Sequence, residues 1–466
     1  MPSILRPLPS TPRLDEVAVF DALERVLPRA TLRAVLVERR ARAPRCRKLP
    51  AELALLLAVS MALYPHEALE RVLGKLLRGL RLLCLHRRAS PFEAATKGAI
   101  CQARYRLGAR PLARLFRQVC RPLATPSTPG AFLFDLRTMA LDSTLEALPD
   151  TPANARAFGR PANQHGAVGF PLVRGVYLLE CGTHAVVDAG FWPAAVSEHR
   201  GARRLLRSIT PGMLVLWDCG LHSAELITAV HQRGAHVLSR VPSGVRLPVA
   251  EPLADGSYLA WLTTGKDWAR RRHRRRLVRV VAYTLTDPAR PGTGQRHRLL
   301  TTLLDPSQAP ATDLVVGYHA RWEIEVSLDE QATHLRQARP RLRSHKPLGV
   351  LQELYGLLLA HYAVRATMAE AAAEADLDPR RLSFVHAVQL ITDALPEFQL
   401  VAPAVHPALY ARLLADLRRH QLPPRADRQN PRVLRFRRRK YPPKRPAHTP
   451  WPQPTKPFRQ AIQLLI

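Results

Sequence analysis

Apolar side chains in residues 1–125 recur every three to four positions between short polar or proline-containing breaks. This spacing places them on one face of a helix. A more continuous apolar run follows Pro50, and proline suits the first turn of a helix. We therefore predict an all-helical N-terminal domain over 1–125. Its expected helices cover Asp15–Leu27, Thr31–Arg40, Pro50–Tyr64, Ala94–Arg106 and Pro111–Leu123.

The pattern changes after the proline-rich segment 122–129. Three runs rich in β-forming residues come first, and a helix, a strand, a helix and a strand follow. This order is typical of a ribonuclease-H-like mixed sheet of the α/β class, in which strand ends converge on one edge. The predicted elements are strands at Ala131–Leu145, Leu172–Cys181, Ala185–Phe191, Met213–Trp217 and His236–Arg240, and helices at His199–Ile209 and Ser223–Arg233.

Strand signals replace the next expected helix over about 241–311, which predicts a β-rich insertion before the helix that begins at Thr312. Helical spacing resumes over Thr312–Arg339 and Leu348–Ala373. Together these segments define a catalytic domain over 130–420. The segment 421–466 is predicted to be a basic C-terminal arm. It is expected to be extended or disordered over Arg425–Arg445, which holds ten Lys and Arg residues, one acid and several prolines.

The charge balance favours a polyanion as partner. The chain has 70 Lys and Arg against 37 Asp and Glu, a formal net charge of +33. Biased base composition of the gene would also enrich arginine, and an anionic membrane is a competing partner. Nucleic acid fits best, because each neutralised phosphate releases counterions. We expect DNA contacts at the basic cluster that includes Arg47 and Lys48. The run Arg270–Arg276, which follows two tryptophans, reads equally well as DNA contact or as a solvated hairpin tip.

No segment predicts a membrane partner. The most apolar stretch, Leu53–Tyr64, is shorter than the roughly 18–20 residues that a bilayer span needs. Prolines and an early acid interrupt the N-terminus where a signal peptide requires an apolar core. The six cysteines are scattered, which argues against a structural zinc site or a disulfide framework. We therefore expect a cytoplasmic protein that associates with the nucleoid when it binds DNA.

Two isolated aspartates stand at predicted strand ends. Asp142 lies in MALDST, and Asp218 closes the strand MLVLWD. A carboxylate beside an apolar run is costly unless it is paired, and a bound cation would offset that cost. A hydrogen bond to the following turn is the simpler alternative. Carboxylate oxygens are the ligands that Mg²⁺ prefers, and divalent ions promote phosphodiester cleavage.

A third acid lies on the predicted helix that begins at Thr312. In YHARWEIE, the residues Tyr318, Arg321 and Glu325 are spaced by three and four, so they share one helical face. Arg321 can hold a DNA phosphate in a bidentate manner while Glu325 binds metal. Other acids compete for the ligand roles, and Asp329, one turn beyond Glu325, is the strongest of them. The rest are Asp135, Asp150, Glu323 and Glu330.

These segments together resemble the insertion-sequence-four family of DDE transposases, through nearly the whole chain. RKLPAE at 47–52 is similar to part of the family's N-terminal helical domain. LDSTLEALPDTPANARAFGRP and LVLWDCGLHS resemble the regions around its first and second aspartates. YHARWEIE and the later RSHKPLGVLQELYGLLLAHYAVR resemble its Tyr-Arg-Glu-Lys helix and the segment after it.

The resemblance implies Asp142, Asp218 and Glu325 as catalytic metal ligands, with Tyr318 and Arg321 as DNA-contacting residues. It also implies two Mg²⁺ or Mn²⁺ ions, terminal inverted repeats and target DNA as partners, and a homodimer in the synaptic complex. The implied activity is cut-and-paste transposition, commonly through hairpinned ends.

The chain departs from the family pattern at three positions. Cys219 and Leu221 stand where Arg and Phe are frequent, and Ala332 stands where the family has Lys, seven residues after Glu325. The missing ammonium should weaken the grip on a phosphate, unless Arg336 or Lys346 replaces it. A catalytically impaired, transposase-derived DNA-binding protein is therefore the alternative to an active transposase. A stand-alone nuclease is a third interpretation.

Overall fold

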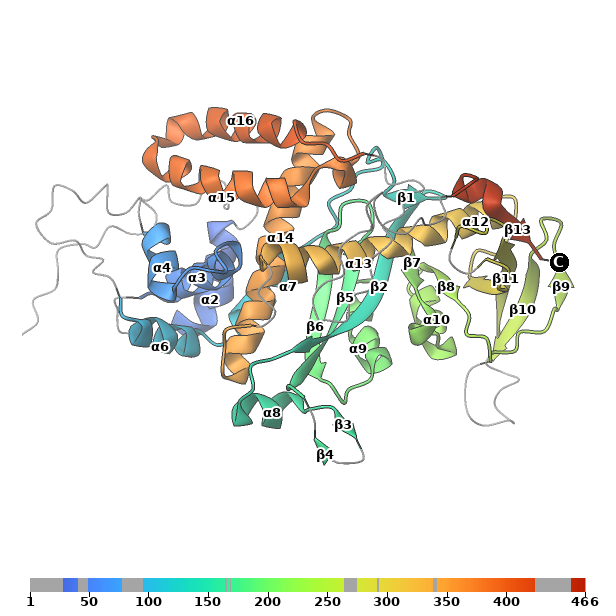
Figure 1. Ribbon diagram of the computed structural model, residues 1–466, viewed down its shortest axis with the longest axis horizontal. Coiled ribbons are helices and arrows are strands. Elements are labelled where there is room, and N and C mark those ends of the chain that lie inside the picture. Colours follow the sequence, from blue (N-terminus) through green and yellow to red (C-terminus); the bar gives the residue numbers. More distant parts are fainter. Residues whose placement is uncertain are drawn as a thin grey trace, which may run out of the picture. The chain divides into compact units, whose positions relative to one another are not determined.

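In a computed structural model, shown in Figure 1, the chain forms two compact units. The first unit comprises Met1–Pro129, Ser143–Gly201 and Ile324–Gln421, and the second Gly130–Asp142, Ala202–Glu323 and Leu422–Ile466. Each unit is considered by itself. The structure describes residues 28–40, 49–77, 95–163, 166–167, 169–263, 275–290, 293–337, 342–423 and 454–465.

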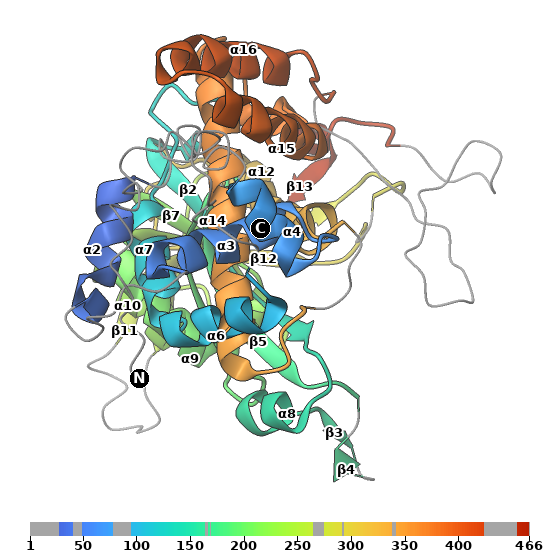
Figure 2. The same cartoon turned by 90° about the vertical axis from the view of Figure 1, so that its left-hand side faces the viewer.

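The first unit is built around one long buried helix, α14 (Pro347–Ala373), visible in Figure 2. The shorter helix α3 (Ala51–Leu63) packs against it, and both helices are apolar around most of their circumference, as expected for helices inside a core. Other helices of this unit are α2 (Arg29–Arg40), α4 (Leu69–Leu76), α6 (Lys97–Leu107), α7 (Arg110–Val119), α15 (Phe384–Leu400) and α16 (His406–Arg418).

The predicted N-terminal helices are confirmed where the structure describes them. Four of the five predicted ranges overlap α2, α3, α6 and α7, whereas Asp15–Leu27 lies outside the described residues. The pattern did not predict α4. Because α3, α6 and α7 all contact α14, these N-terminal helices share a core with the helical segment that begins at Pro347.

The first unit also contains an antiparallel hairpin of β5 (Leu172–Glu180) and β6 (Val186–Pro193). Its strand order is β6-β5-β2, to which β2 contributes residues 143–147. A small buried cluster joins the hairpin to the start of α14: Val173 belongs to it together with Leu148, Val350 and Leu354. The remaining elements of this unit are α8 (Pro152–Phe158), β3 (Ala162–Asn163), β4 (Gly166–Ala167) and the first half of α9 (Glu198–Leu205), as far as Gly201.

A mixed sheet forms the second unit, with strand order β2-β7-β8-β12-β11-β10-β9. β2, β7 and β8 are parallel neighbours, and the later strands join antiparallel. The second unit is thus mixed α/β, as predicted. The strands are β2 (Leu136–Ala147), preceded by β1 (Phe132–Leu133), then β7 (Met213–Trp217), β8 (His236–Arg240), β9 (Glu251–Pro252), β10 (Tyr258–Thr263), β11 (Arg275–Leu285) and β12 (His297–Thr301).

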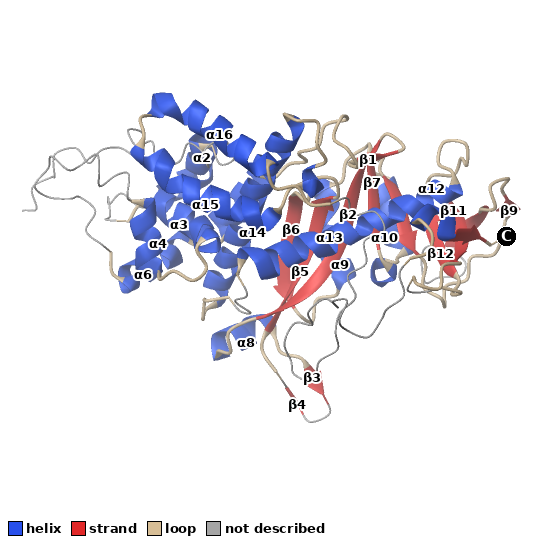
Figure 3. Cartoon of the chain, turned by 45° about the horizontal axis from the view of Figure 1, so that its top comes forward, coloured by secondary structure: helices blue, strands red, loops and turns tan. Residues whose placement is uncertain are grey.

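Helix α12 (Ala311–Tyr318) covers one face of this sheet, and α10 (Ala224–His231) contacts β8, as Figure 3 shows. Leu314 and Val315 of α12 belong to the same buried cluster as Leu214 and Leu216 of β7. The all-buried β7 has the continuous apolar pattern of a parallel strand covered on both faces. Its even-numbered side chains therefore face α12.

The structure describes part of the predicted basic C-terminal arm, 421–466. Residues 424–453, which include the run Arg425–Arg445 predicted to be extended or disordered, lie outside the described residues. Ile462–Leu464 form a strand, β13, that pairs with β11. Asp287 accepts backbone N–H groups of Thr455 and Lys456 at 3.1 and 3.4 Å. The sequence pattern did not predict β13, because three residues of strand carry too little periodicity to distinguish them from a coil.

No described helix is long and apolar enough to cross a membrane.

The strands predicted over about 241–311 are present as β9, β10, β11 and β12. The predicted long helix Thr312–Arg339 is interrupted: α12 leads through a 3-10 turn into α13 (Trp322–Asp329), and a π turn follows over Glu330–Leu335.

A cluster of ionisable side chains lies inside the first unit. Glu330, His184, His361 and Arg365 are all buried and hydrogen-bonded to one another. Burial alone would raise the pKa of the Glu330 carboxyl, but Arg365 and His184 outweigh this effect and hold that pKa well below 4.5. Burial lowers the pKa of His361 from 6.5.

These pKa shifts predict acid lability. As pH falls, the unfolded chain protonates at His361 near 6.5 and at Glu330 near 4.5, whereas the folded chain resists both protonations until lower pH. The free energy of unfolding should therefore decrease below about pH 6.5, by on the order of 1–3 kcal/mol at about pH 4. Urea denaturation across this range measures it. His361→Gln should flatten the upper part of the profile, and an unchanged slope in that variant would contradict the assignment.

Candidate functional site

Asp142 and Asp218 stand level with each other where two neighbouring parallel strands stop pairing. Asp218 follows the end of β7 as predicted, whereas Asp142 lies within β2, which continues to Ala147. Ala140 of β2 is paired with Leu216 of β7, and the two aspartates follow two residues further along each chain. Adjacent strands lie about 4.8 Å apart, and side chains two positions apart point to the same face. Both carboxylates therefore leave the sheet on the face that α12 covers, and both are only partly buried.

The end of α12 brings two further predicted residues to the same place. The Tyr318 hydroxyl donates a hydrogen bond to the carbonyl of Trp217, the residue before Asp218, at 3.2 Å. Just beyond the helix, Nη1 of Arg321 lies 3.7 Å from Oδ2 of Asp142. Within the second unit, the fold thus brings together four of the residues that the sequence singled out.

The electrostatics of this group are consistent with its geometry. Burial raises the pKa of the Tyr318 hydroxyl far above 10, the Arg321 charge lowers it, and the Asp218 carboxylate raises it again. Tyr318 is therefore a neutral hydrogen-bond donor at physiological pH. Oδ1 of Asp218 accepts the backbone N–H of Gly220 at 2.8 Å, which orients this carboxylate at the strand exit.

Glu325 belongs to the first unit, on α13. It is exposed, whereas Ile324 and Ser327 on the same helix are buried. The helix therefore has one face inside the first unit and another toward solvent, and Glu325 is on the solvent face.

Most of the acids that compete for a metal-ligand role have other positions or partners. Asp135 is in the turn between β1 and β2, before β2 begins. Asp150 is paired with Arg160, and Glu330 is buried among basic side chains. Asp329 accepts from Thr333 at 2.6 Å and lies 3.3 Å from His334.

The two cations considered as replacements for the missing lysine, Arg336 and Lys346, have other partners in the first unit. Arg336 pairs with Glu146 at 2.5 Å, which raises the pKa of this buried guanidinium despite its desolvation. The Lys346 ammonium lies 4.9 Å from the centre of the Tyr105 ring. Ala332 is exposed. The predicted DNA contacts Arg47 and Lys48 lie outside the described residues.

In the part of the chain that the structure describes, no three His, Cys, Asp or Glu side chains converge on a point that could hold a metal ion. The pair Asp142 and Asp218 nevertheless suits a hard divalent cation, because both donors are carboxylates at one strand edge. The Arg321 guanidinium places a positive charge 3.7 Å from one of these carboxylates, that of Asp142.

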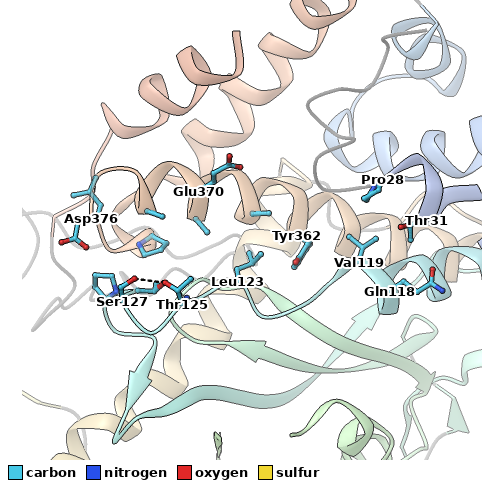
Figure 4. A pocket seen from close by; sticks show the side chains of 17 residues that line it. Pro28, Thr31, Gln118, Val119, Leu123, Thr125, Ser127, Tyr362, Glu370 and Asp376 are labelled. Carbon is cyan, nitrogen blue, oxygen red and sulfur yellow. Dashed lines mark hydrogen bonds between the residues drawn. The ribbon is translucent and has the colours of Figure 1, made fainter. Parts of the chain in front are cut away.

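The first unit contains a cavity of about 530 Å³ (Figure 4). Tyr362 and Glu370 of α14 line it, opposite a loop that includes Thr125 and Ser127. Glu370 accepts a hydrogen bond from Tyr410 at 2.6 Å. None of the candidate residues borders the cavity, so we assign it no part in the chemistry.

Sequence reasoning missed the buried partners of Glu330. His184 sits in the turn after β5, and His361 and Arg365 lie in the apolar run LLLAHYAVRATM of α14. Ionisable residues inside an apolar helix are a usable signal, because they are buried only when paired. The sequence could have flagged them, but not named their partner.

Comparison with known proteins places these segments in context. Residues 18–117 match a family model described as insertion element 4 transposase N-terminal, and residues 134–363 match a transposase DDE domain. The chain is 31% identical over 404 residues to the transposase InsG for insertion sequence element IS4 of Escherichia coli K12, covering 85% of this chain and 88% of that protein.

Two further proteins are more distant. The putative transposase InsZ of the same organism is 27% identical over 141 residues, which cover 30% of this chain and 47% of that protein. A piggyBac transposase, solved in a synaptic complex with hairpin DNA, aligns over 87% of both chains at 14% identity and a TM-score of 0.44. At that TM-score, the likeness says nothing further about this chain.

Proposed function

The chain belongs to the insertion element 4 family of DDE transposases, and from this premise we propose that it excises and reinserts DNA by metal-dependent strand cleavage and strand transfer. Asp142, Asp218 and Glu325 are the three carboxylates of the reaction. The observation that carries the proposal is the level placement of Asp142 and Asp218 just beyond the parallel pairing of β2 and β7, beside Arg321 and Tyr318.

The catalytic region is proposed to be ribonuclease-H-like. An antiparallel hairpin, β5 and β6, and a parallel set, β2, β7 and β8, are the strand pairings of such a sheet. In this fold the reactive groups gather at the carboxyl end of the parallel pairing. Asp142 and Asp218 lie just beyond the last paired residues of β2 and β7.

Each residue then has a distinct task. Asp142 and Asp218 would hold divalent cations, Mg²⁺ or Mn²⁺, and Glu325 is proposed as the third ligand. When bound, a pair of such ions activates the attacking oxygen and stabilises the leaving oxygen of a phosphodiester. Arg321 moves from Asp142 to a DNA phosphate, for which its guanidinium is well shaped. Tyr318 positions Asp218 through its bond to the Trp217 carbonyl.

The proposed partners are the terminal inverted repeats of a mobile element and a target DNA. The net charge of +33 supplies the attraction to phosphates, and Arg47 and Lys48 are proposed to contribute to it. Since two element ends must be joined, a homodimer is proposed for the synaptic complex.

An end-cleavage assay tests the proposal. The full chain is incubated with end-labelled DNA carrying the terminal repeats of its element and Mg²⁺ or Mn²⁺, and binding is measured in parallel by gel shift. The expected result is strand cleavage at the repeat boundary that depends on the divalent ion. Specific binding without any cleavage would reject the transposase activity and support the second function.

That second function is a DNA-binding protein with impaired catalysis. Ala332 favours it, since Arg336 and Lys346 already contact Glu146 and Tyr105. The variant Ala332→Lys separates the two in the same assay. If Ala332→Lys cleaves much faster than the native chain, the native chain is an impaired enzyme. If the native chain cleaves and Ala332→Lys cleaves at nearly the same rate, the native chain is an active enzyme.

A further inference from the structure

The helix that carries Glu325 is held by its opposite face. At about 100° per residue, Ser327 and Glu330 lie roughly 140–200° around the helix from Glu325. Both are buried, as are Ile324 and Gln331, whereas Glu325 is exposed. The contacts of the buried face therefore determine the direction in which the Glu325 side chain leaves the helix.

Glu330 makes directional contacts with three side chains. Its Oε1 accepts from Nδ1 of His184 at 3.0 Å, and its Oε2 accepts from Nε2 of His361 at 3.1 Å and from Nε of Arg365 at 2.9 Å. The second nitrogen of the Arg365 fork pairs with Oε1. All four side chains are at most 4% exposed, so the group is screened from water.

A second contact one turn earlier ties the same helix to the hairpin. The Ser327 hydroxyl donates to the carbonyl of His184 at 3.4 Å, and the backbone N–H of His184 donates to the Glu180 carbonyl at 2.9 Å. His184 has a φ of 59° in the turn between β5 and β6. The side chain of His184 thus holds the helix at Glu330, and its main-chain carbonyl holds the helix at Ser327.

The backbone changes register at the same residue. The π turn begins at Glu330, and the Gln331 side chain donates to the Ser327 carbonyl at 3.2 Å. Single π turns inside α-helices are frequent at functional sites. A change in helical register at Glu330 would rotate α13 relative to the residues that contact its buried face. The contacts of Glu330 must therefore fix this register.

We propose that Glu330, together with Arg365, His184 and His361, positions α13 so that the Glu325 carboxylate is held for divalent-ion binding. This rests on the proposed role of Glu325. A paired buried charge is no better than apolar packing for stability, but its hydrogen bonds fix one rotation of the helix where apolar side chains would accept several.

Metal binding and stability separate this role from a merely structural one. In the full chain, Mn²⁺ binding is titrated by electron paramagnetic resonance, thermal unfolding gives Tm, and cleavage gives the Mg²⁺ concentration for half-maximal rate. Glu330→Gln should raise the Mn²⁺ Kd and the Mg²⁺ requirement by about 10-fold or more, as loss of an outer contact to a metal ligand does. DNA binding should stay within about 3-fold.

The double variant Glu330→Leu/Arg365→Met removes both buried charges and refills the space with apolar atoms. It should recover most of the Tm lost in Glu330→Gln, because no unpaired charge remains, while the Mn²⁺ Kd stays raised. Recovery of both Tm and metal affinity would overturn the positioning role, as would a Glu330→Gln protein that loses only Tm.

Two controls complete the design. Glu353→Gln breaks another buried contact of α14, where Oε1 of Glu353 accepts from Ser344 and lies 3.8 Å from Arg104, and should lower Tm without moving the Mn²⁺ Kd. Glu325→Gln tests the premise: if metal binding and cleavage survive it, the proposed role of Glu325 and the positioning role both fail, whereas the proposed strand cleavage itself stands. If they are lost while Glu330→Gln binds metal normally, the positioning role alone fails.

Discussion

Asp142→Asn and Asp218→Asn are each expected to slow strand cleavage by at least about 10³-fold, equivalent to roughly 4 kcal/mol of transition-state stabilisation. An amide has nearly the shape of a carboxylate but no negative charge, so it cannot hold a hard divalent ion in the same way. Binding to the terminal repeats should change little, because phosphate contacts by basic residues provide most of that affinity. The assay measures cleavage and gel shift on the same preparations.

Asp135→Asn is the matched control. The substitution is identical and Asp135 precedes the same strand, but it lies in the exposed β1–β2 turn, with a positive φ of 58° that asparagine tolerates. Its cleavage rate should equal that of the native chain. If Asp142→Asn cleaves normally and Asp329→Asn does not, the ligand set proposed here is wrong.

Gly356→Ala is expected to reduce the free energy of unfolding by about 1–3 kcal/mol, although it adds one methyl group. A Cβ at residue 356 of α14 would lie 2.3 Å from the backbone oxygen of Ala58 in α3 and 2.9 Å from its carbonyl carbon. Backbone atoms cannot turn away as a side chain can, so the two helices must separate. Equilibrium denaturation in urea gives the change.

The same substitution at Gly74 should have the opposite sign. Gly74 lies inside α4, and a Cβ there meets nothing within 4 Å, so alanine keeps its helical advantage of up to about 1 kcal/mol. Equal destabilisation by the two variants would show that the close approach of α3 and α14 is not the cause. A stable Gly356→Ala protein would argue that these helices do not share a core.

The local pattern of the chain determined much of this protein. Continuous apolar runs predicted α3 and β7, strand-forming runs predicted the insertion, and isolated acids after apolar strands pointed to Asp142 and Asp218. These features depend on burial and on the period of helix and strand, which neighbouring residues encode. The Tyr318, Arg321 and Glu325 spacing was visible for the same reason.

Only tertiary structure decided which distant residues meet. No local pattern specifies that Ala140 pairs with Leu216, and this register is what makes the two aspartates level. Likewise Glu330 looked like one more acid beside Glu325, until folding buried it against His184, His361 and Arg365. Partner choice depends on strand register and on packing between segments far apart in the chain, so it is a property of the whole fold.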